Sequence, residues 1–150
     1  MKKRIFALTA ACLALVLALT ACGGKKPFAV EETVAALRDS AAFSEELEPM
    51  EREIFVRHYN LKGETLTDGA AYGSTGATAE EFAVLVFQDD AAAEVGEAAL
   101  RNYLEDQLEA NRDYRPGDMP KLEKAVVERR ENTVLLLVAN DYGGAEKALG

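Results

Sequence analysis

Cysteine, histidine and tryptophan are scarce in this chain of 150 residues. The two cysteines, Cys12 and Cys22, lie near the start, His58 is the only histidine, and there is no tryptophan. Beyond residue 22 the chain therefore forms no disulfide and offers no thiol for catalysis or metal binding. One histidine without a second ligand at metal-site spacing gives no zinc motif. We expect neither a metal nor a cofactor.

Acidic residues are absent before Glu31, and the chain opens instead with basic and then apolar residues. Three basic residues at positions 2–4 precede a 15-residue apolar stretch, 5–19, which is shorter than the roughly 20 residues of a membrane span. This pattern is typical of a secretory signal peptide. The ending Leu19-Thr-Ala-Cys22 resembles the lipobox of bacterial lipoproteins. The resemblance implies cleavage before Cys22 and a diacylglyceryl group on its thiol.

The sequence thus divides into a signal peptide at 1–21, a lipidated tether at 22–30 and one domain at 31–150. Cys12 is the competing lipid acceptor, but cleavage there would leave too short a hydrophobic segment. The tether, CGGKKPFAV, contains glycine, lysine and proline and shows no periodicity. The remaining segment has a typical size for a single hydrophobic core.

Charge is distributed unevenly along the chain. All 26 acidic residues but only 12 of the 17 basic ones follow residue 30, which gives that segment a formal charge of −14. Such a charge repels phosphate backbones and argues against a nucleic-acid partner. Lys25 and Lys26 lie close to the anchor, where each contributes about 1 kcal/mol of attraction to anionic head groups. We expect the basic tether to hold the acidic domain away from its membrane.

Hydrophobic periodicity predicts an α+β domain with a small, mainly antiparallel four-stranded sheet. The expected order is ααββαββα, with the helices packed on one face of the sheet. The helices are predicted at 30–38, 51–59, 89–112 and 145–149, and the strands at 66–72, 81–88, within 121–130 and at 133–139. The strands 81–88 and 133–139 are apolar on nearly every residue and are therefore expected at the centre.

With these elements placed, the chain resembles a family of exported bacterial lipoproteins, domain-of-unknown-function family 4358. The similarity rests on the lipobox at Cys22, Val34 and Leu37, Tyr59-Asn60-Leu61, the strand at 81–86, Tyr114-x-Pro116 and the strand at 134–138. Asn60 stands where members usually have glycine, and asparagine is the next-best residue for a left-handed turn. The family has no known activity. Its mostly Gram-positive members imply an anchor on the outer face of the plasma membrane.

His58 is the only side chain here that commonly titrates near neutral pH. It follows the acidic residues Glu45, Glu46, Glu48, Glu51 and Glu53. One hypothesis makes His58 a general base or a ligand beside these carboxylates. The alternative, which we favour, is a side chain at a helix end, where a positive charge suits the negative C-terminus.

Three other features could form sites. The loop Gly73-Ser-Thr-Gly76 lacks the lysine of a phosphate-binding loop and precedes Glu80 and Glu81, so we interpret it as an ordinary loop. Of the paired carboxylates, Asp89 and Asp90 are interpreted as caps of the long helix. The other pairs, including Glu80 and Glu81, are expected on a solvated surface rather than across a sugar-cleaving cleft. Tyr114 with Pro116 is a candidate partner surface, since tyrosine is favoured in interfaces. Alternatively, Tyr114 packs under the long helix.

These observations favour a membrane-anchored extracytoplasmic lipoprotein that acts as a non-enzymatic binding or interaction module. Its expected partners are the membrane, through the lipid on Cys22, and an unidentified protein or envelope component. Two alternatives stay open: a carboxylate-dependent hydrolase of envelope polymers, and a structural accessory subunit of a membrane complex. No catalytic residue is assigned.

Overall fold

The computed structural model describes residues 24–150, so the signal peptide and Cys22 lie outside the described residues. Within that range the protein is α+β, with one antiparallel sheet of five strands in the order β1-β2-β3-β5-β4. The elements are α2 (Val30–Arg38), β1 (Glu48–Met50), α3 (Arg52–His58), η2 (Gly63–Thr65), β2 (Leu66–Gly73), β3 (Glu81–Phe87), α4 (Asp90–Tyr114), η3 (Pro116–Asp118), α5 (Met119–Glu123), β4 (Val126–Arg130), β5 (Thr133–Val138) and α6 (Tyr142–Leu149).

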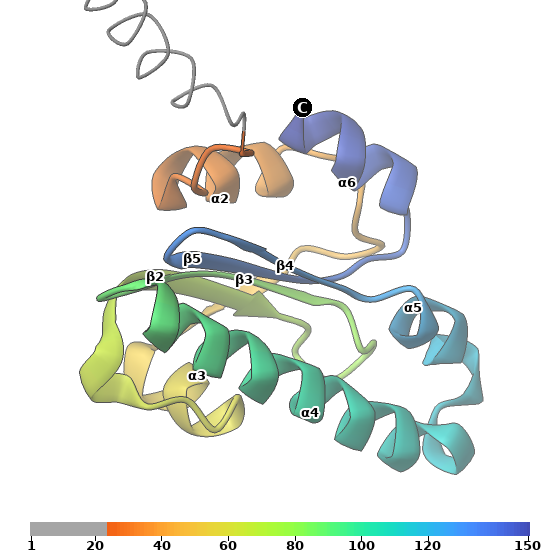
Figure 1. Ribbon diagram of the computed structural model, residues 1–150. Coiled ribbons are helices and arrows are strands. Elements are labelled where there is room, and N and C mark those ends of the chain that lie inside the picture. The colour runs from red at the N-terminus through yellow and green to blue at the C-terminus, as the bar shows by residue number, and fades with distance from the viewer. Residues whose placement is uncertain (1–23) are drawn as a thin grey trace, which may run out of the picture.

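Helices cover both faces of the sheet: α2 and α6 lie on one face, and α3 and α4 lie on the other (Figure 1). Side chains alternate along β3, so Phe82 and Val84 join the core under α2 and α6, whereas Leu85 and Phe87 join the core under α3 and α4. The prediction of helices on one face is therefore wrong. Because β3 and β5 are apolar on both sides, each side of the sheet needs a cover.

The predicted four-stranded sheet and the order ααββαββα also need correction, because the structure adds the edge strand β1. Its residues Glu48 and Met50 pair with Gly73 and Ala71 of β2. This short segment contains Pro49 and resembles a turn in sequence, but proline is tolerated on an edge strand. The segment 114–120, whose two prolines and one glycine favour a loop, contains η3 and the first residues of α5.

Other local predictions are confirmed. Asp89 caps α4 by accepting a hydrogen bond of 2.8 Å from the N–H of Ala92. Asn60 has a φ of 53°, as expected for asparagine in a left-handed turn. Along α4, Leu100 is fully buried, whereas Val95 is 48% exposed.

Part of the predicted tether at 22–30 is packed on the domain. Phe28 is 6% exposed, and its N–H donates a hydrogen bond of 3.0 Å to Oγ1 of Thr133. The guanidinium of Arg130 lies 4.0 Å from the centre of the Phe28 ring. Nearby, Nζ of Lys25 lies 2.8 Å from Oε1 of Glu128. Tertiary packing therefore begins before residue 31.

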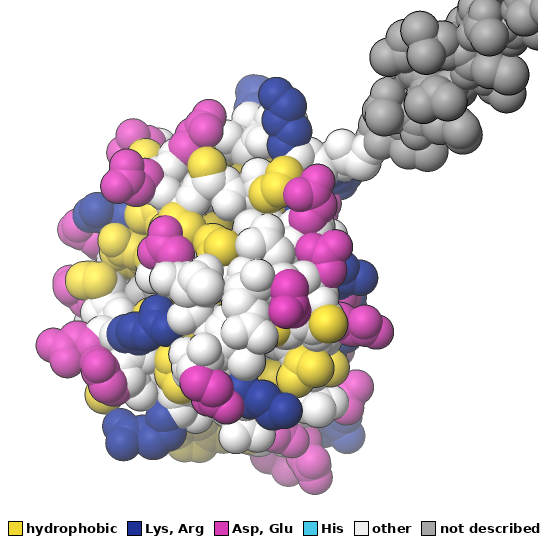
Figure 2. Space-filling model, turned by 60° about the vertical axis from the view of Figure 1, so that its left-hand side comes forward, with side chains coloured by type: hydrophobic (Ala, Val, Ile, Leu, Met, Phe, Trp, Pro, Cys, Tyr) yellow, Lys and Arg dark blue, Asp and Glu magenta, His cyan; other side chains and the backbone are white. Residues whose placement is uncertain are grey.

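The surface of the described domain is mixed in character. On the face shown in Figure 2, acidic side chains are spread among basic ones and small apolar patches. No helix within residues 24–150 is both long enough and apolar enough to cross a membrane.

Candidate functional site

Two adjacent carboxylates, Glu80 and Glu81, are buried where β3 begins. Glu80 is 1% exposed and Glu81 is 5% exposed, so the prediction that this pair lies on a solvated surface is wrong. A buried carboxylate is tolerated only with ionic or hydrogen-bonding partners. The two residues have different partners, and we call the two groups the Glu80 network (Ser44, Glu80, Asp118, Lys121) and the Glu81 network (His58, Tyr59, Glu81, Tyr103).

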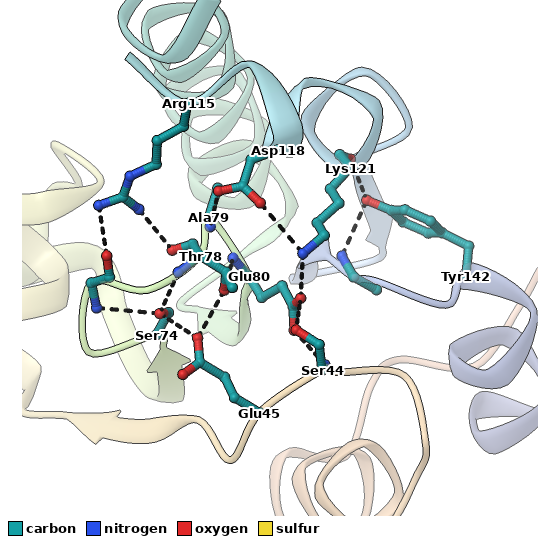
Figure 3. Close-up of polar contacts among 12 residues, drawn as sticks. Ser44, Glu45, Ser74, Thr78, Ala79, Glu80, Arg115, Asp118, Lys121 and Tyr142 are labelled. Atoms are coloured by element: carbon teal, nitrogen blue, oxygen red, sulfur yellow. Dashed lines mark hydrogen bonds and ion pairs between the residues drawn. The ribbon is translucent and has the colours of Figure 1, made fainter.

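The Glu80 network joins the start of β3 to the segment before β1 and to α5 (Figure 3). The ammonium of Lys121 lies 2.6 Å from Oε1 of Glu80 and 3.3 Å from Oδ1 of Asp118. The N–H of Ser44 donates to Oε2 of Glu80 at 2.7 Å, and the Ser44 hydroxyl donates to Oε1. Asp118 also accepts the N–H of Ala79 at 3.0 Å. These contacts hold three chain segments together.

Charge pairing within the Glu80 network outweighs desolvation. Burial alone raises the pKa of the Glu80 carboxyl, but hydrogen bonds from Lys121 and Ser44 reverse the effect and lower this pKa below its ordinary value. Burial likewise opposes the charge of Lys121, but Glu80 and Asp118 raise the pKa of its ammonium. Both partners are therefore held in their charged forms.

The loop between β2 and β3 is fastened on two sides. The hydroxyls of Ser74 and Thr78 both donate to Oε1 of Glu45, the latter at 2.9 Å. From the end of α4, Arg115 donates to the carbonyl oxygens of Gly76 at 2.7 Å and Thr78 at 3.1 Å (Figure 3). The Ser74 hydroxyl, which also accepts the N–H groups of Gly76 and Thr78, is thus fully engaged within the loop.

The Glu81 network is a carboxylate held by two phenols. Tyr59 donates to Oε2 of Glu81 at 2.8 Å, and Tyr103 donates to Oε1 at 2.7 Å. Nε2 of His58 lies 2.8 Å from the Tyr103 oxygen and 3.7 Å from Oε2 of Glu81. Because Tyr103 gives its only hydroxyl proton to Glu81, its oxygen accepts from the Nε2–H of His58. His58 is thus at the end of α3, as favoured, but its carboxylate neighbour is Glu81.

The two phenols of the Glu81 network act as neutral donors. Burial, followed by the negative charge of Glu81, raises the pKa of Tyr59 well above its ordinary value. The same two causes raise the pKa of Tyr103. A phenol that resists ionisation is a poor nucleophile and a poor base. The arrangement is therefore suited to holding a buried negative charge rather than to activating a hydroxyl.

An open cavity of about 210 Å³ lies between the β2–β3 loop and α4. We call it the α4 cavity. Its α4 wall presents every fourth residue, Tyr103, Gln107, Asn111 and Arg115, and its other walls include Glu81, His58 and Met50. Asn111 is 8% exposed, and its Nδ2 donates to the backbone oxygen of Gln107 at 2.9 Å. No buried side-chain nitrogen or oxygen atom within residues 24–150 lacks a hydrogen-bond partner.

The sequence-predicted site residues fall in different places. Cys22 lies outside the described residues. Tyr114 is 77% exposed, so it does not pack under α4, and the guanidinium of Arg115 lies 5.4 Å from its ring centre. Pro116 is also exposed. The role of Tyr114 and Pro116 as a partner surface stays a prediction.

Sequence reasoning missed the Glu81 network. One signal is present in the sequence: Glu81 is the first residue of a strand that is apolar on both faces, so its side chain must lie against a core. Nothing in the sequence pairs it with Tyr59 and Tyr103, which come from separate elements. Across residues 24–150, no three His, Cys, Asp or Glu side chains are grouped as a metal site.

A family model described as "Domain of unknown function (DUF4358)" matches residues 39–139. This span runs from the end of α2 to the end of β5 and includes both carboxylate networks and the α4 cavity. No curated protein and no solved structure matches the chain.

Proposed function

This chain belongs to the DUF4358 family, and from that premise we propose that it is a lipid-anchored extracytoplasmic protein whose domain acts as a binding module. In this proposal the chain is cleaved after residue 21, and Cys22 carries the lipid. The domain then lies on the outer side of the plasma membrane. It recruits a protein or envelope component and catalyses no reaction.

The burial of Phe28, six residues after Cys22, carries this proposal. A fully extended chain covers at most about 3.5 Å per residue, so Phe28 lies within about 20 Å of the anchored cysteine. Lys25 also lines one cavity with Leu149 and Gly150 at the end of α6. The side of the domain that carries Phe28 and the end of α6 therefore faces the membrane. Such a short connection suits a domain held close to the bilayer.

This arrangement revises the expected use of the basic tether. Because Lys25 is paired with Glu128 at 2.8 Å, its ammonium helps to fix the N-terminal segment to β4. Lys26, which is exposed, is then the basic residue of this segment that is best placed for anionic head groups.

The two carboxylate networks favour binding over hydrolysis. Enzymes that cleave sugar polymers place two carboxyl groups across one cleft. Here Glu80 is bound by Lys121 and Ser44, whereas Glu81 is bound by two tyrosines. The proposed partner surface at the end of α4 is of a different kind: Tyr114 is an exposed aromatic residue beside an arginine, and both residue types are enriched in interfaces.

The anchor is tested with the full chain and its Cys22→Ala variant, labelled in cells with a fatty acid that carries a detectable tag. The wild-type protein should take up the label and fractionate with membranes. Cys22→Ala should lose the label and either leave the membrane fraction or remain as precursor. Cys12→Ala is the matched control and should behave as wild type. A labelled, processed Cys22→Ala protein would exclude this anchor.

The binding role is tested by cross-linking in native membranes. The wild type should give discrete cross-linked products, and Tyr114→Ala should weaken them. Ile54→Ala is the control, since Ile54 is an exposed apolar residue on α3, at 45% exposure. Equal products from both variants would place the partner surface elsewhere.

A further inference from the structure

An open groove of about 740 Å³ lies between α2 and the loop at 39–47, on the face of the sheet opposite α4 (Figure 1). We call it the α2 groove. Its apolar floor is formed by Val34, Phe43, Leu47 and Phe82. Phe82 and Leu47 are 0% and 6% exposed, whereas Val34 and Phe43 are half-buried. An apolar side chain that enters this groove therefore exchanges water for a largely apolar surface.

A stack of aromatic rings holds the floor in place. The ring of Phe43 stacks on that of Phe82 with 5.5 Å between their centres, and Phe82 stacks on Tyr72 at 5.0 Å. The guanidinium of Arg38 lies 5.4 Å from the centre of the Tyr72 ring. These contacts join α2, the loop, β2 and β3, so the groove is already formed before a ligand enters it. A preformed groove lowers the entropic cost of binding.

The rim of the α2 groove carries an excess of negative charge. Its lining includes four carboxylates, from Glu31, Asp39, Glu45 and Glu46, but only one cation, Arg38. Within residues 24–150, the one ion pair among these five side chains joins Arg38 to Glu46 at 3.9 Å, and both partners are at least half exposed. Because Glu31 lies on α2 and the other three carboxylates lie on the loop, negative charge flanks the apolar floor on both sides.

This excess distinguishes the α2 groove from the other apolar cavity on the same face of the sheet. That cavity, at the end of α6, is lined by two cations, Lys25 and Arg130, and two carboxylates, Glu128 and Glu146. Its charges are therefore balanced. An unbalanced charge on an apolar groove favours a ligand of opposite sign and repels one of the same sign.

Charge and apolar surface together select the occupant. A second copy of this domain is repelled, since the chain beyond residue 30 has a formal charge of −14. Anionic lipid head groups are repelled for the same reason. A free polyamine would neutralise the rim but has no side chain to cover the floor. A polypeptide with an apolar residue between basic residues matches both the floor and the rim.

We propose that the α2 groove binds a basic segment of a partner protein, with one aromatic or aliphatic side chain on the floor and Lys or Arg on both sides of it. The inference rests on the proposed binding-module function and names the chemistry of one partner. The groove is separate from Tyr114, which lies at the end of α4 on the opposite face of the sheet.

Calorimetric titration of the full chain in detergent tests the inference with three blocked pentapeptides, after subtraction of the heat from titration into detergent alone. The first, acetyl-Lys-Lys-Phe-Lys-Lys-amide, has both required features. The second has serine in place of phenylalanine, and the third has glutamate in place of each lysine. The first peptide should bind, and the other two should bind weaker by a factor of about ten or more. No binding of the first peptide, or equal binding of the first two, would overturn the inference.

Two double variants locate the site. Asp39→Asn combined with Glu46→Gln removes two exposed carboxylates of the rim and should weaken binding of the first peptide about threefold or more. Glu94→Gln combined with Glu105→Gln removes the same charge from exposed positions on α4 and is the matched control. Its affinity should stay within about twofold of the wild type. Equal losses in the two variants, or wild-type affinity in the rim variant, would show that the peptide does not bind in the α2 groove.

The two proposals fail separately. Absent peptide binding with intact lipid labelling and cross-linking would remove the α2 groove as a site and leave the anchored binding module. Binding of the first peptide alone by a protein that takes up no lipid would retain the groove and remove the anchor.

Discussion

The ammonium nitrogen of Lys121 lies 2.6 Å from Oε1 of Glu80, a residue 41 positions earlier in the chain. The Glu80 side chain has no exposed surface, and that of Lys121 is 17% exposed. This pair connects the start of the central strand β3 to α5, the short helix that leads into β4. It is the most deeply buried of the ion pairs between residues 24 and 150.

Glu80→Gln should destabilise the domain by roughly 3 kcal/mol at pH 7, because removing one partner leaves a largely buried charge. The effect should depend on pH. The pKa of Glu80 is lowered in the folded state, so its stabilisation is present above the unfolded pKa and is lost as pH falls through the folded one. Urea unfolding should therefore show that the difference in free energy of unfolding between wild type and Glu80→Gln becomes smaller from pH 7 to pH 3.

The control for this prediction is Glu64→Gln, since Glu64 is exposed and outside the network. It should change stability by less than about 0.5 kcal/mol. If the stability difference between Glu80→Gln and wild type is the same at pH 7 and pH 3, the pair does not stabilise the fold through its charges.

Tyr103→Phe should cost about 1–3 kcal/mol, because Glu81 loses a donor inside the protein. The wild-type protein should also lose stability as pH rises above about 10. The pKa of both Tyr59 and Tyr103 is raised on folding, so the unfolded chain releases these protons first and their stabilisation is lost with rising pH. Measurements of the free energy of unfolding from pH 8 to pH 11 should show this loss. The free energy should fall less steeply with pH in Tyr103→Phe.

Tyr114→Phe serves as the comparison, because that ring is 77% exposed. Between pH 8 and pH 11, its free energy of unfolding should fall as steeply with pH as that of the wild type. If Tyr103→Phe also keeps the full slope, the phenol of Tyr103 is not held neutral by the fold.

The sequence was sufficient to predict most individual elements. The continuous apolar runs of β3 and β5 and the Asp89 cap of α4 are local signals, and each element forms where its signal lies. The strand β1 carries almost no local signal, since three residues with a proline become a strand only by pairing with β2. The same apolar runs require a cover on both faces of the sheet, which the helices α2 and α6 on one side and α3 and α4 on the other provide.

The candidate site was much less predictable. The ring of Tyr103 packs against the core under α3 and α4, but nothing local in the sequence shows that its hydroxyl meets Glu81. The Glu81 network combines residues from α3, its C-cap, β3 and α4. Such a site is defined by the packing of separate elements, which periodicity does not specify.

Gly96→Ala should destabilise the protein although alanine is the better helix former by about 1 kcal/mol. A Cβ at position 96 would lie 2.1 Å from Cζ of Phe87, whose ring is 1% exposed and cannot move into solvent. We expect a net loss of about 1–3 kcal/mol in thermal or urea unfolding. Gly117→Ala, where a Cβ meets no atom within 4 Å, should be nearly neutral. A stabilised Gly96→Ala would show that α4 can shift away from β3.

Phe28→Ala should detach the N-terminal segment from the domain as well as reduce stability. The substitution removes a ring that is 6% exposed and that lies beneath Arg130, and such losses typically cost about 3–5 kcal/mol. Trypsin cleaves after lysine unless proline follows, so the bond after Lys25 reports directly on this segment, whereas the bond between Lys26 and Pro27 is resistant. On membranes that carry the protein, trypsin should release the domain faster from Phe28→Ala than from the wild type.

Phe55→Ala is the matched control: Phe55 is 2% exposed but lies in the core under α4. Phe55→Ala should lose comparable stability. Under conditions where both variants stay folded, its cleavage after Lys25 should remain slow. Equal release from both variants would mean that Phe28 does not fix the domain beside its anchor, and the proposed membrane-facing side would then be wrong.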